Sequence, residues 1–294
     1  MIIKRNSLIV SFLSLLIIHL VGCSADENNS RESKEIVTWG HEYIGIANKE
    51  TGKKIKVAVV DSGIFSEHED LEGKVVESFN AINATDNIVD DYGHGTNIAG
   101  ILNANQNSIG MIGVSQDIEL FDVKVLNSEG KGEIDDILRG LMWAYEKEVD
   151  IINISFGFSK SYIELEETIN TLTSEGIIVI ASAGNRLGQE VDFPAKYPNV
   201  ISVGSMNETG EVDVLSSLGK IDVFGPGTNI YTTNKDGTYE TVRGTSFATA
   251  FITGAVAKGM LNEEIERSKN SFDESLSYLE ETGLKYNRIQ TDKG

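Results

Sequence analysis

Short apolar runs alternate with amphipathic stretches along the chain from residue 36 onward. The runs are rich in β-branched residues, which predicts buried strands. The stretches between them carry apolar residues at helical spacing. Buried strands that alternate with helices are typical of a parallel sheet covered on both faces, so we expect an α/β fold. The expected strands are Ile55–Val60, Leu120–Leu126, Ile151–Ile154, Ile177–Ser182 and Val200–Val203, and the expected helices are His94–Leu102, Ile134–Tyr145, Tyr162–Ser174 and Ser246–Leu261.

The N-terminal segment predicts export and lipid attachment. A basic start precedes an apolar stretch at residues 7–21, which is too short for a membrane span of about 20 apolar residues. The stretch ends in Leu20-Val21-Gly22-Cys23, which resembles the lipobox of bacterial lipoproteins. The resemblance implies a signal peptide at residues 1–22 and a lipid on Cys23 that anchors the exported protein to the outer face of the cell membrane. An ordinary signal peptide followed by an incidental cysteine is the alternative.

Composition narrows the domain organisation and the partners. Residues 23–35 are polar and lack apolar periodicity, which predicts a disordered tether, and residues 36–294 can form one large core. The 45 acidic residues outnumber the 25 basic ones and give a net charge of −20 that is spread along the chain, which argues against a nucleic-acid partner. Such a charge favours cationic peptides, although solubility is the simpler reason for it. The lone cysteine excludes a disulfide framework, and a monomer is the default expectation.

The last part of the chain is highly charged but keeps a helical pattern. Phe272, Leu276 and Leu279 recur at helical spacing within residues 262–294. We therefore expect one closing helix that docks against the domain.

Three glycine-rich turns carry the side chains of a candidate catalytic site. Asp61 ends an expected buried strand, at the edge of the sheet where α/β proteins gather ligands and catalytic groups. His94 stands between two glycines at the start of an expected helix, and Ser246 begins the last strong helical pattern. Each residue taken alone has a structural alternative: a turn aspartate, a structural histidine and a helix N-cap. Their occurrence together, in the order Asp, His, Ser, favours a catalytic triad.

The segments around these residues resemble those of the subtilases. They are Val57–Gly63, Gly93–Thr96 and Gly244–Ala248, and the resemblance runs from Trp39 to Met260. It implies a subtilisin-like α/β fold, with a mostly parallel twisted sheet and helices on both faces. It also implies that the domain is a serine endopeptidase acting on peptides or proteins.

The resemblance assigns a role to each catalytic candidate. Ser246 would be the nucleophile, His94 its general base, and Asp61 the group that orients His94 and stabilises its protonated form. Asn185 would supply the side-chain amide of the oxyanion hole, beside the backbone N–H of Ser246. The sequence departs from the family pattern at Asn97, where a histidine is usual, and in lacking the proline that follows the nucleophile. Neither departure removes a catalytic group.

Further motifs imply how a peptide would bind. Gly130-Lys131-Gly132 and Ser155-Phe156-Gly157 match the segments that hold a substrate backbone as an added strand. Asp192, just before an aromatic-Pro pair, matches the floor of the family's primary specificity pocket. A carboxylate there favours cleavage after Arg, with Lys second. A solvated loop position for Asp192 is the alternative, and Arg186 near the pocket rim would oppose a basic side chain.

A structural calcium site is implied by the same resemblance. Asp70 matches the bidentate carboxylate of the family's strong site, and residues 105–111 resemble its ligand loop. The implied ligands are Asp70, the side chain of Asn107, and the carbonyl groups of Asn105, Ile109 and Met111. Glu35 falls near the position of an N-terminal ligand, in a loosely aligned region. A polar turn without metal is the alternative.

Three functions remain open at this point. The first is a processing endopeptidase that cuts exported peptide precursors, similar to the leader peptidases encoded with lantibiotics, with a lantibiotic precursor as partner. The second is a broad degradative protease at the cell surface. The third is a catalytically inactive subtilase fold that serves as a binding lipoprotein, and the intact catalytic set weighs against it.

Overall fold

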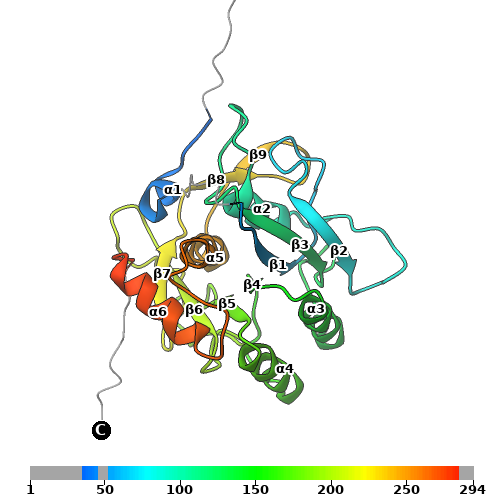
Figure 1. Cartoon of the computed structure of the whole chain (residues 1–294), viewed down its shortest axis with the longest axis vertical. Helices are drawn as coiled ribbons and strands as arrows, with labels where there is room; N and C mark the ends of the chain where they lie inside the picture. Colours follow the sequence, from blue (N-terminus) through cyan, green and yellow to red (C-terminus); the bar gives the residue numbers. More distant parts are fainter. Residues whose placement is uncertain (1–34, 46–51, 285–294) are drawn as a thin grey trace, which may run out of the picture. The chain divides into compact units, whose positions relative to one another are not determined.

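A seven-stranded parallel sheet forms the centre of the domain in the computed structural model, which describes residues 35–45 and 52–284. Its strands run in the order β2-β3-β1-β4-β5-β6-β7, and β8 and β9 form a separate antiparallel hairpin (Figure 1). The strands are β1 (Ile55–Asp61), β2 (Val75–Asn80), β3 (Ile118–Lys124), β4 (Ile151–Ile154), β5 (Ile178–Ser182), β6 (Ile201–Met206), β7 (Val223–Pro226), β8 (Ile230–Thr233) and β9 (Tyr239–Val242). The helices are α1 (Trp39–Ile44), α2 (His94–Asn103), α3 (Ile134–Glu146), α4 (Ile163–Ser174), α5 (Thr245–Leu261) and α6 (Ser271–Glu281).

Helices cover the two faces of this sheet and bury two apolar clusters. Along β1, Val57 and Val59 point into the cluster that includes residues of α2 and α5, whereas Ala58 and Val60 point into the cluster that includes residues of α3 and α4. Successive strand residues face opposite sides, so β1 needs apolar residues at every position. The parallel α/β fold with helices on both faces is confirmed.

Helix α5 passes through the interior of the domain. All its residues are buried except Lys258 in the last turn, and small residues allow close contacts such as that of Gly254 with Val114. A helix that is apolar on all sides belongs in a core. This burial fixes the N-terminal end of α5, which carries Ser246.

The predicted elements are found close to their predicted bounds. Strand β3 ends at Lys124 instead of Leu126, and β6 continues to Met206 instead of ending at Val203. Val125 and Leu126 follow β3 but still pack into the cluster that includes α3, and their N–H groups both donate to the carbonyl of Asp61. The predicted closing helix is α6, and its Leu279 joins the same apolar cluster as α5.

Four strands and one helix of the described residues were not predicted from the sequence. Strand β2 lies at the sheet edge and is largely exposed, so it has no continuous apolar run. Strands β8 and β9 mix polar and apolar residues, and β7 is only four residues long. Helix α1 spans six residues, too few to show a period.

The predicted signal peptide at residues 1–22, the lipid site Cys23 and most of the tether lie outside the described residues. Within the described ranges, no helix has the length and apolar character needed to cross a membrane.

Candidate active site

The candidate catalytic residues meet at the carboxyl edge of the sheet. Asp61 ends β1, and Ser155 follows the neighbouring strand β4. Chain order reverses at β1, which has β3 on one side and β4 on the other. Such a switch point leaves a crevice outside the strand ends. The N-terminal ends of α2 and α5 bring His94 and Ser246 to this edge.

Asp61 and His94 form a hydrogen-bonded pair. Nδ1 of His94 lies 2.9 Å from each carboxylate oxygen of Asp61. A carboxylate only accepts, so Nδ1 carries the hydrogen and Nε2 is left as the basic nitrogen of the neutral ring. Burial lowers the pKa of His94, but attraction to Asp61, the hydrogen bond and the charge of Asp90 outweigh it, so the net pKa is raised above 6.5.

Ser246 is the second residue of α5 and is nearly buried. Its hydroxyl donates to the carbonyl oxygen of Ser155 at 2.7 Å, and the Ser155 hydroxyl donates to the carbonyl of Ser246 at 3.1 Å. The ring of the next residue, Phe247, lies 5.5 Å from the His94 ring, centroid to centroid, which places the start of α5 beside His94. The hydroxyl thus bonds to Ser155 and not to His94 in this conformation. Catalytic hydrogen bonds commonly tighten only in the substrate complex.

Asn185 lies beside the N-terminal end of α5. Its Oδ1 accepts from the backbone N–H of Thr245 at 2.9 Å and from the Thr245 hydroxyl at 3.2 Å. A backbone N–H can only donate, so this contact fixes which end of the amide is oxygen and leaves Nδ2 free to donate elsewhere. A Cβ on Gly244 would stand 2.8 Å from that Nδ2. Glycine at 244 therefore lets the amide approach the nucleophile segment.

Asp90 anchors the first turn of α2. Its Oδ1 accepts from the N–H of Gly93 at 2.7 Å and from the hydroxyl of Ser62 at 2.8 Å, while its Oδ2 accepts from the N–H of Thr96 at 3.0 Å. The Ser62 hydroxyl in turn accepts from the N–H of Gly95 at 3.0 Å. A carboxylate at a helix N-terminus satisfies open N–H groups and complements the helix dipole. This network holds His94 in place against β1.

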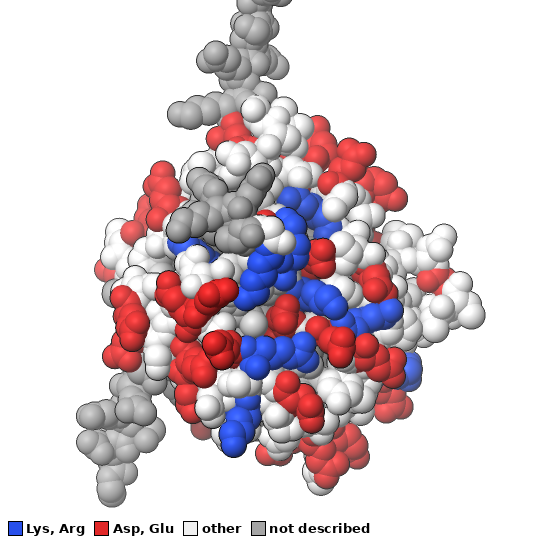
Figure 2. Space-filling view, viewed as in Figure 1, with Lys and Arg blue, Asp and Glu red and all other residues white. Residues whose placement is uncertain are grey.

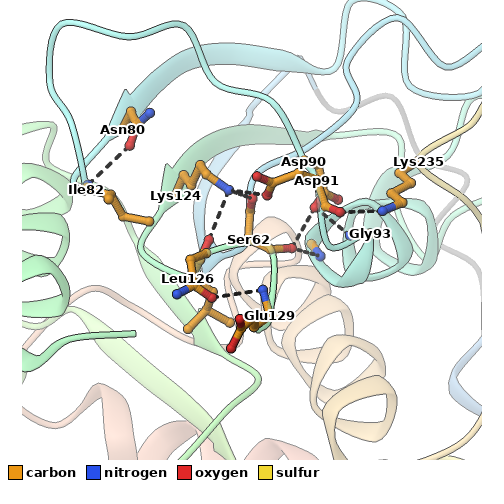
Figure 3. A network of polar contacts seen from close by, with 12 residues as sticks. Ser62, Asn80, Ile82, Asp90, Asp91, Gly93, Lys124, Leu126, Glu129 and Lys235 are labelled. Carbon is orange, nitrogen blue, oxygen red and sulfur yellow. Dashed lines mark hydrogen bonds and ion pairs between the residues drawn. The ribbon is translucent and has the colours of Figure 1, made fainter. Parts of the chain in front are cut away.

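Lys124 links the same turn to the loop that follows β3 (Figure 3). Its nearly buried ammonium donates to the carbonyls of Ser62 at 2.7 Å and Leu126 at 3.0 Å, and to the Asp91 carboxylate at 2.9 Å. From the other side, Lys235 donates to the backbone carbonyl of Asp91. The three donors of one ammonium therefore join the end of β1, the turn before α2 and the start of the 126–132 loop.

Comparison with known proteins identifies the family. The family model described as Subtilase family, Peptidase_S8, matches residues 52–268. The chain belongs to the Subtilase family.

Several subtilases are similar to this chain. Subtilisin amylosacchariticus from Bacillus subtilis subsp. amylosacchariticus is 41% identical over 212 residues, which cover 70% of this chain and 55% of that protein. The subtilisin of Bacillus pumilus is also 41% identical and is covered to 77%. A crystal structure of a cold adapted subtilisin-like serine proteinase superposes with a TM-score of 0.71 at 26% identity, covering 80% of this chain and 89% of that one. The chain thus spans about half the length of the first of these relatives.

In this subtilase, Asp192 lies between two glycine segments that the sequence assigned to substrate binding and to the oxyanion hole. A Cβ on Gly157 would stand 2.7 Å from the Cβ of Asp192, and a Cβ on Gly184 would stand 2.5 Å from its Oδ2. Phe158 and Phe193 exchange two backbone hydrogen bonds of 2.8 Å, which hold the segments together. Asp192 is almost buried, so the solvated-loop alternative does not describe it. Its carboxylate pairs with Arg186 at 2.8 Å.

The other expected binding segment forms a tight loop. The backbone N–H of Asn127 donates to the carbonyl of Lys131, and the Asn127 side chain accepts from the N–H of Lys131. Gly130 has a φ of +70°, which strains any residue that carries a Cβ, and a Cβ there would stand 2.6 Å from the ring of Tyr92. Gly132 packs against the buried side chain of Leu126. The loop and the turn before α2 are therefore in contact.

The expected calcium residues also come together in this subtilase. The Asp70 carboxylate accepts from the Asn107 amide at 2.9 Å, from the Met111 N–H at 2.9 Å and from the Tyr239 hydroxyl at 2.8 Å. Glu35 accepts from the N–H of Asn107 at 2.8 Å. Ile109 donates to the Asn107 side chain, and the N–H of Asn105 donates to the carbonyl of Asp70. Within residues 35–45 and 52–284, no three His, Cys, Asp or Glu side chains are grouped to hold a metal.

Sequence reasoning missed the supporting residues of the site. Thr245 orients Asn185, Asp90 and Ser62 anchor α2, and Lys124 joins three loops. A lysine inside the apolar run before Leu126 was the available signal, because a buried ammonium requires oxygen partners. Asn97, the departure from the family pattern, donates to the carbonyl of Thr233 at 2.7 Å and so joins α2 to the β8–β9 hairpin.

Proposed function

We propose that this chain is a serine endopeptidase in which Asp61, His94, Ser246 and Asn185 carry out acyl transfer. The observation that carries the proposal is the Asp61–His94 pair, with both oxygen–nitrogen distances at 2.9 Å, beside the ring of Phe247, the residue that follows Ser246. The similarity to subtilisins supports it. An inactive binding protein would have no need for a buried carboxylate that raises the pKa of a histidine.

Acylation starts when a peptide carbonyl enters the crevice. The Ser246 hydroxyl turns from the Ser155 carbonyl toward Nε2 of His94, which takes its proton as Oγ bonds to the carbonyl carbon. Asp61 stabilises the imidazolium that forms and remains ionised. His94 then returns the proton to the leaving amine as the C–N bond breaks. Water repeats the sequence on the acyl enzyme and releases the acid product.

The developing oxyanion is stabilised by donors that are already oriented. Thr245 holds the Oδ1 atom of Asn185, which fixes the orientation of the amide and leaves Nδ2 as a donor for the oxyanion. The backbone N–H of Ser246, at the start of α5, is the second donor. Donors fixed before the reaction stabilise charge without reorganisation in the transition state.

The substrate we propose is an exported peptide precursor, such as a lantibiotic precursor, cut after a basic residue. The almost buried Asp192 carboxylate, between Gly157 and Gly184, supports this preference because a sheltered carboxylate favours a cationic side chain. Gly130-Lys131-Gly132 and Ser155-Phe156-Gly157 would hold the precursor backbone. A broad degradative role predicts no dominant residue before the cut.

Matched peptides that differ only in the residue before the cut test this function. We expect kcat/KM to be highest for Arg, then Lys, then Leu and Phe, and Asp192→Ser to remove the preference. Ser246→Ala should lower turnover by about 10⁶, the scale known for subtilisin itself, and Ser277→Ala, on the exposed side of α6, serves as its control. Cleavage by Ser246→Ala within tenfold of the parent would refute the mechanism, and a preference for Leu or Phe would refute the processing role.

We also propose that the protein is exported and held at the outer face of the cell membrane by a lipid on Cys23. The lone cysteine behind Leu20-Val21-Gly22 motivates this proposal. Cells that express the full chain should incorporate labelled fatty acid into it, and the chain should sediment with membranes. Cys23→Ala should remain unlabelled and appear in the medium or as an unprocessed precursor. An unlabelled parent chain would exclude the anchor.

Calcium is the metal we propose for the loop at residues 105–111. Carboxylate, amide and carbonyl oxygens around one loop are the ligands that calcium prefers, so the oxygens of these residues fit the ion once the Asn107 amide and the Tyr239 hydroxyl release the Asp70 carboxylate. Asp70, Asn107 and the carbonyls of Asn105, Ile109 and Met111 would hold the ion, with Glu35 adjacent. Calcium there would supply a structural crosslink and take no part in acyl transfer.

A further inference from the structure

Arg186 follows the oxyanion candidate directly and folds back onto Asp192. Its Nη1 donates to Oδ1 of Asp192 at 2.8 Å. The Asp192 side chain is 12% exposed and that of Arg186 is 38% exposed, so the bond is sheltered on the carboxylate side and accessible on the arginine side. The backbone of the next residue is fixed, because the N–H of Leu187 donates to the carbonyl of Leu215 at 3.1 Å. The loop therefore holds an arginine over the carboxylate.

Two acceptors beside this pair are left open. Asp192 Oδ2 lies 2.5 Å from the point where a Cβ on Gly184 would stand, and the Ser217 hydroxyl lies 3.1 Å from that point. The Ser217 hydroxyl is fully buried and has no hydrogen-bond partner among the described residues. Within the same ranges, Arg186 is the only group that donates to the Asp192 carboxylate. A buried hydroxyl without a partner is costly, so an N–H donor that reached the Ser217 hydroxyl and Oδ2 of Asp192 would be stabilised there.

We propose that Arg186 is a specificity-determining residue, an internal cation that occupies the primary specificity pocket and competes with the basic side chain of the substrate for Asp192. The inference rests on the proposed function in one respect, because it takes Asp192 as the pocket floor. It goes further because it assigns Arg186, a residue of the chain itself, as the occupant of that pocket. A substrate guanidinium then binds Oδ2 and Ser217 after displacing or sharing the contact of Arg186.

Competition of this kind lowers the affinity of basic substrates by a measurable factor. The Arg186 contact is a single charge-assisted hydrogen bond with a partly exposed donor. A basic substrate that must displace this bond from Asp192 therefore binds roughly tenfold more weakly than it would without Arg186. A Leu side chain has no donor for the carboxylate, so it leaves the Arg186–Asp192 pair intact. Arg186 therefore lowers the ratio of kcat/KM for Arg substrates to kcat/KM for Leu substrates.

The test compares the parent chain, Arg186→Gln, and the double variant Arg186→Gln/Asp192→Ser on matched Arg and Leu peptides. We expect the Arg:Leu ratio of kcat/KM to rise roughly tenfold in Arg186→Gln and to collapse in the double variant. Arg139→Gln, which removes an arginine from a pair with Asp136 on α3, is the matched control and should leave the ratio at its parent value. A ratio that stays unchanged or falls in Arg186→Gln overturns the inference, even if the parent cleaves after Arg.

A binding measurement separates this inference from the catalytic proposal. Benzamidine, a small planar cation, is titrated calorimetrically into Ser246→Ala and into Ser246→Ala/Arg186→Gln. We expect roughly tenfold tighter binding to the second protein, and roughly tenfold weaker binding when Ser217→Ala is added to it. This result supports the internal cation whether or not the parent chain hydrolyses peptides. Equal benzamidine affinity with and without Arg186 refutes it, while the hydrolysis assays decide the catalytic proposal separately.

Discussion

The charge of Asp61 determines the pH range in which His94 is a base. His94 is sheltered by Phe247 and Tyr92, yet its pKa is raised because the fully buried Asp61 stabilises the imidazolium. The neutral imidazole is the form that accepts the proton of Ser246. The electrostatics that assist catalysis in the transition state therefore also move the onset of activity toward higher pH.

We predict that kcat/KM falls on the acid side with a midpoint above pH 6.5. The raised pKa keeps His94 protonated, and so inactive as a base, at pH values where a free histidine is already neutral. Asp61→Asn removes the stabilising charge, so the midpoint should move to lower pH while turnover drops. The measurement is a pH profile of kcat/KM with a small peptide substrate. A parent midpoint at or below 6.5, or one unmoved in Asp61→Asn, would contradict this assignment.

At the level of single residues, the sequence predicts which groups act but not how they are held. Asp61, His94 and Ser246 were predicted from glycine-rich turns and Asn185 from the resemblance to subtilases, and the structure brings all four to one edge of the sheet. The bond from Ser246 to the Ser155 carbonyl could not be foreseen, because two segments 91 residues apart must first converge. The pairing of Arg186 with Asp192 was expected only as proximity, since its geometry depends on the loop.

Among the elements, the buried strands were predictable because burial on both faces leaves a continuous apolar run, as in β1 and β4. The edge strand β2 and the β8–β9 hairpin lack that run, so only tertiary contacts specify them. Helix α1 is the extreme case. It packs through Gly40, where a Cβ would stand 2.5 Å from the ring of Phe251, and through the buried His41.

His41 makes the docking of α1 sensitive to acid. Its Nε2 lies 3.3 Å from the carbonyl of Ile101, and its Nδ1 lies 2.7 Å from the Thr38 hydroxyl. The carbonyl only accepts, so Nε2 carries the hydrogen and Nδ1 accepts from Thr38. Burial, partly offset by the bond to Ile101, lowers the pKa of His41 to about 4. The folded protein therefore requires a neutral ring.

We predict that this histidine reduces the free energy of unfolding as the pH falls from 6.5 toward 4. The unfolded state takes up the proton near pH 6.5 and the folded state only near 4, so stability is present above the unfolded pKa and is lost below it. The loss at pH 5 is about 2 kcal/mol. His41→Asn should show a smaller drop in the free energy of unfolding between pH 7 and pH 5, measured by urea denaturation. An identical drop in both proteins would rule out His41 as the source.

Across the whole molecule, acidic residues dominate the surface. Figure 2 shows Asp and Glu scattered over the visible face around a smaller group of Lys and Arg. The net charge of −20 disfavours compaction through self-repulsion. A bound cation that joins separate segments would offset part of that repulsion. The loop at residues 105–111 is the place where such segments meet, because Glu35, Asp70 and Tyr239 all contact it or one another.

We therefore predict that calcium raises the thermal stability of the folded chain by binding at this loop. A ligand at a thousand times its Kd adds about 4 kcal/mol to the free energy of unfolding, which corresponds to a rise in Tm of roughly 10 °C for a domain of this size. Excess chelator should lower Tm by that amount, and added calcium should restore it. Asp70→Asn should respond to neither treatment, because it removes the carboxylate charge that contacts Asn107 and Met111. Asp236→Asn, in the exposed turn between β8 and β9, keeps the loop intact and should respond like the parent. Equal Tm values for the parent chain in chelator and in calcium would exclude the site.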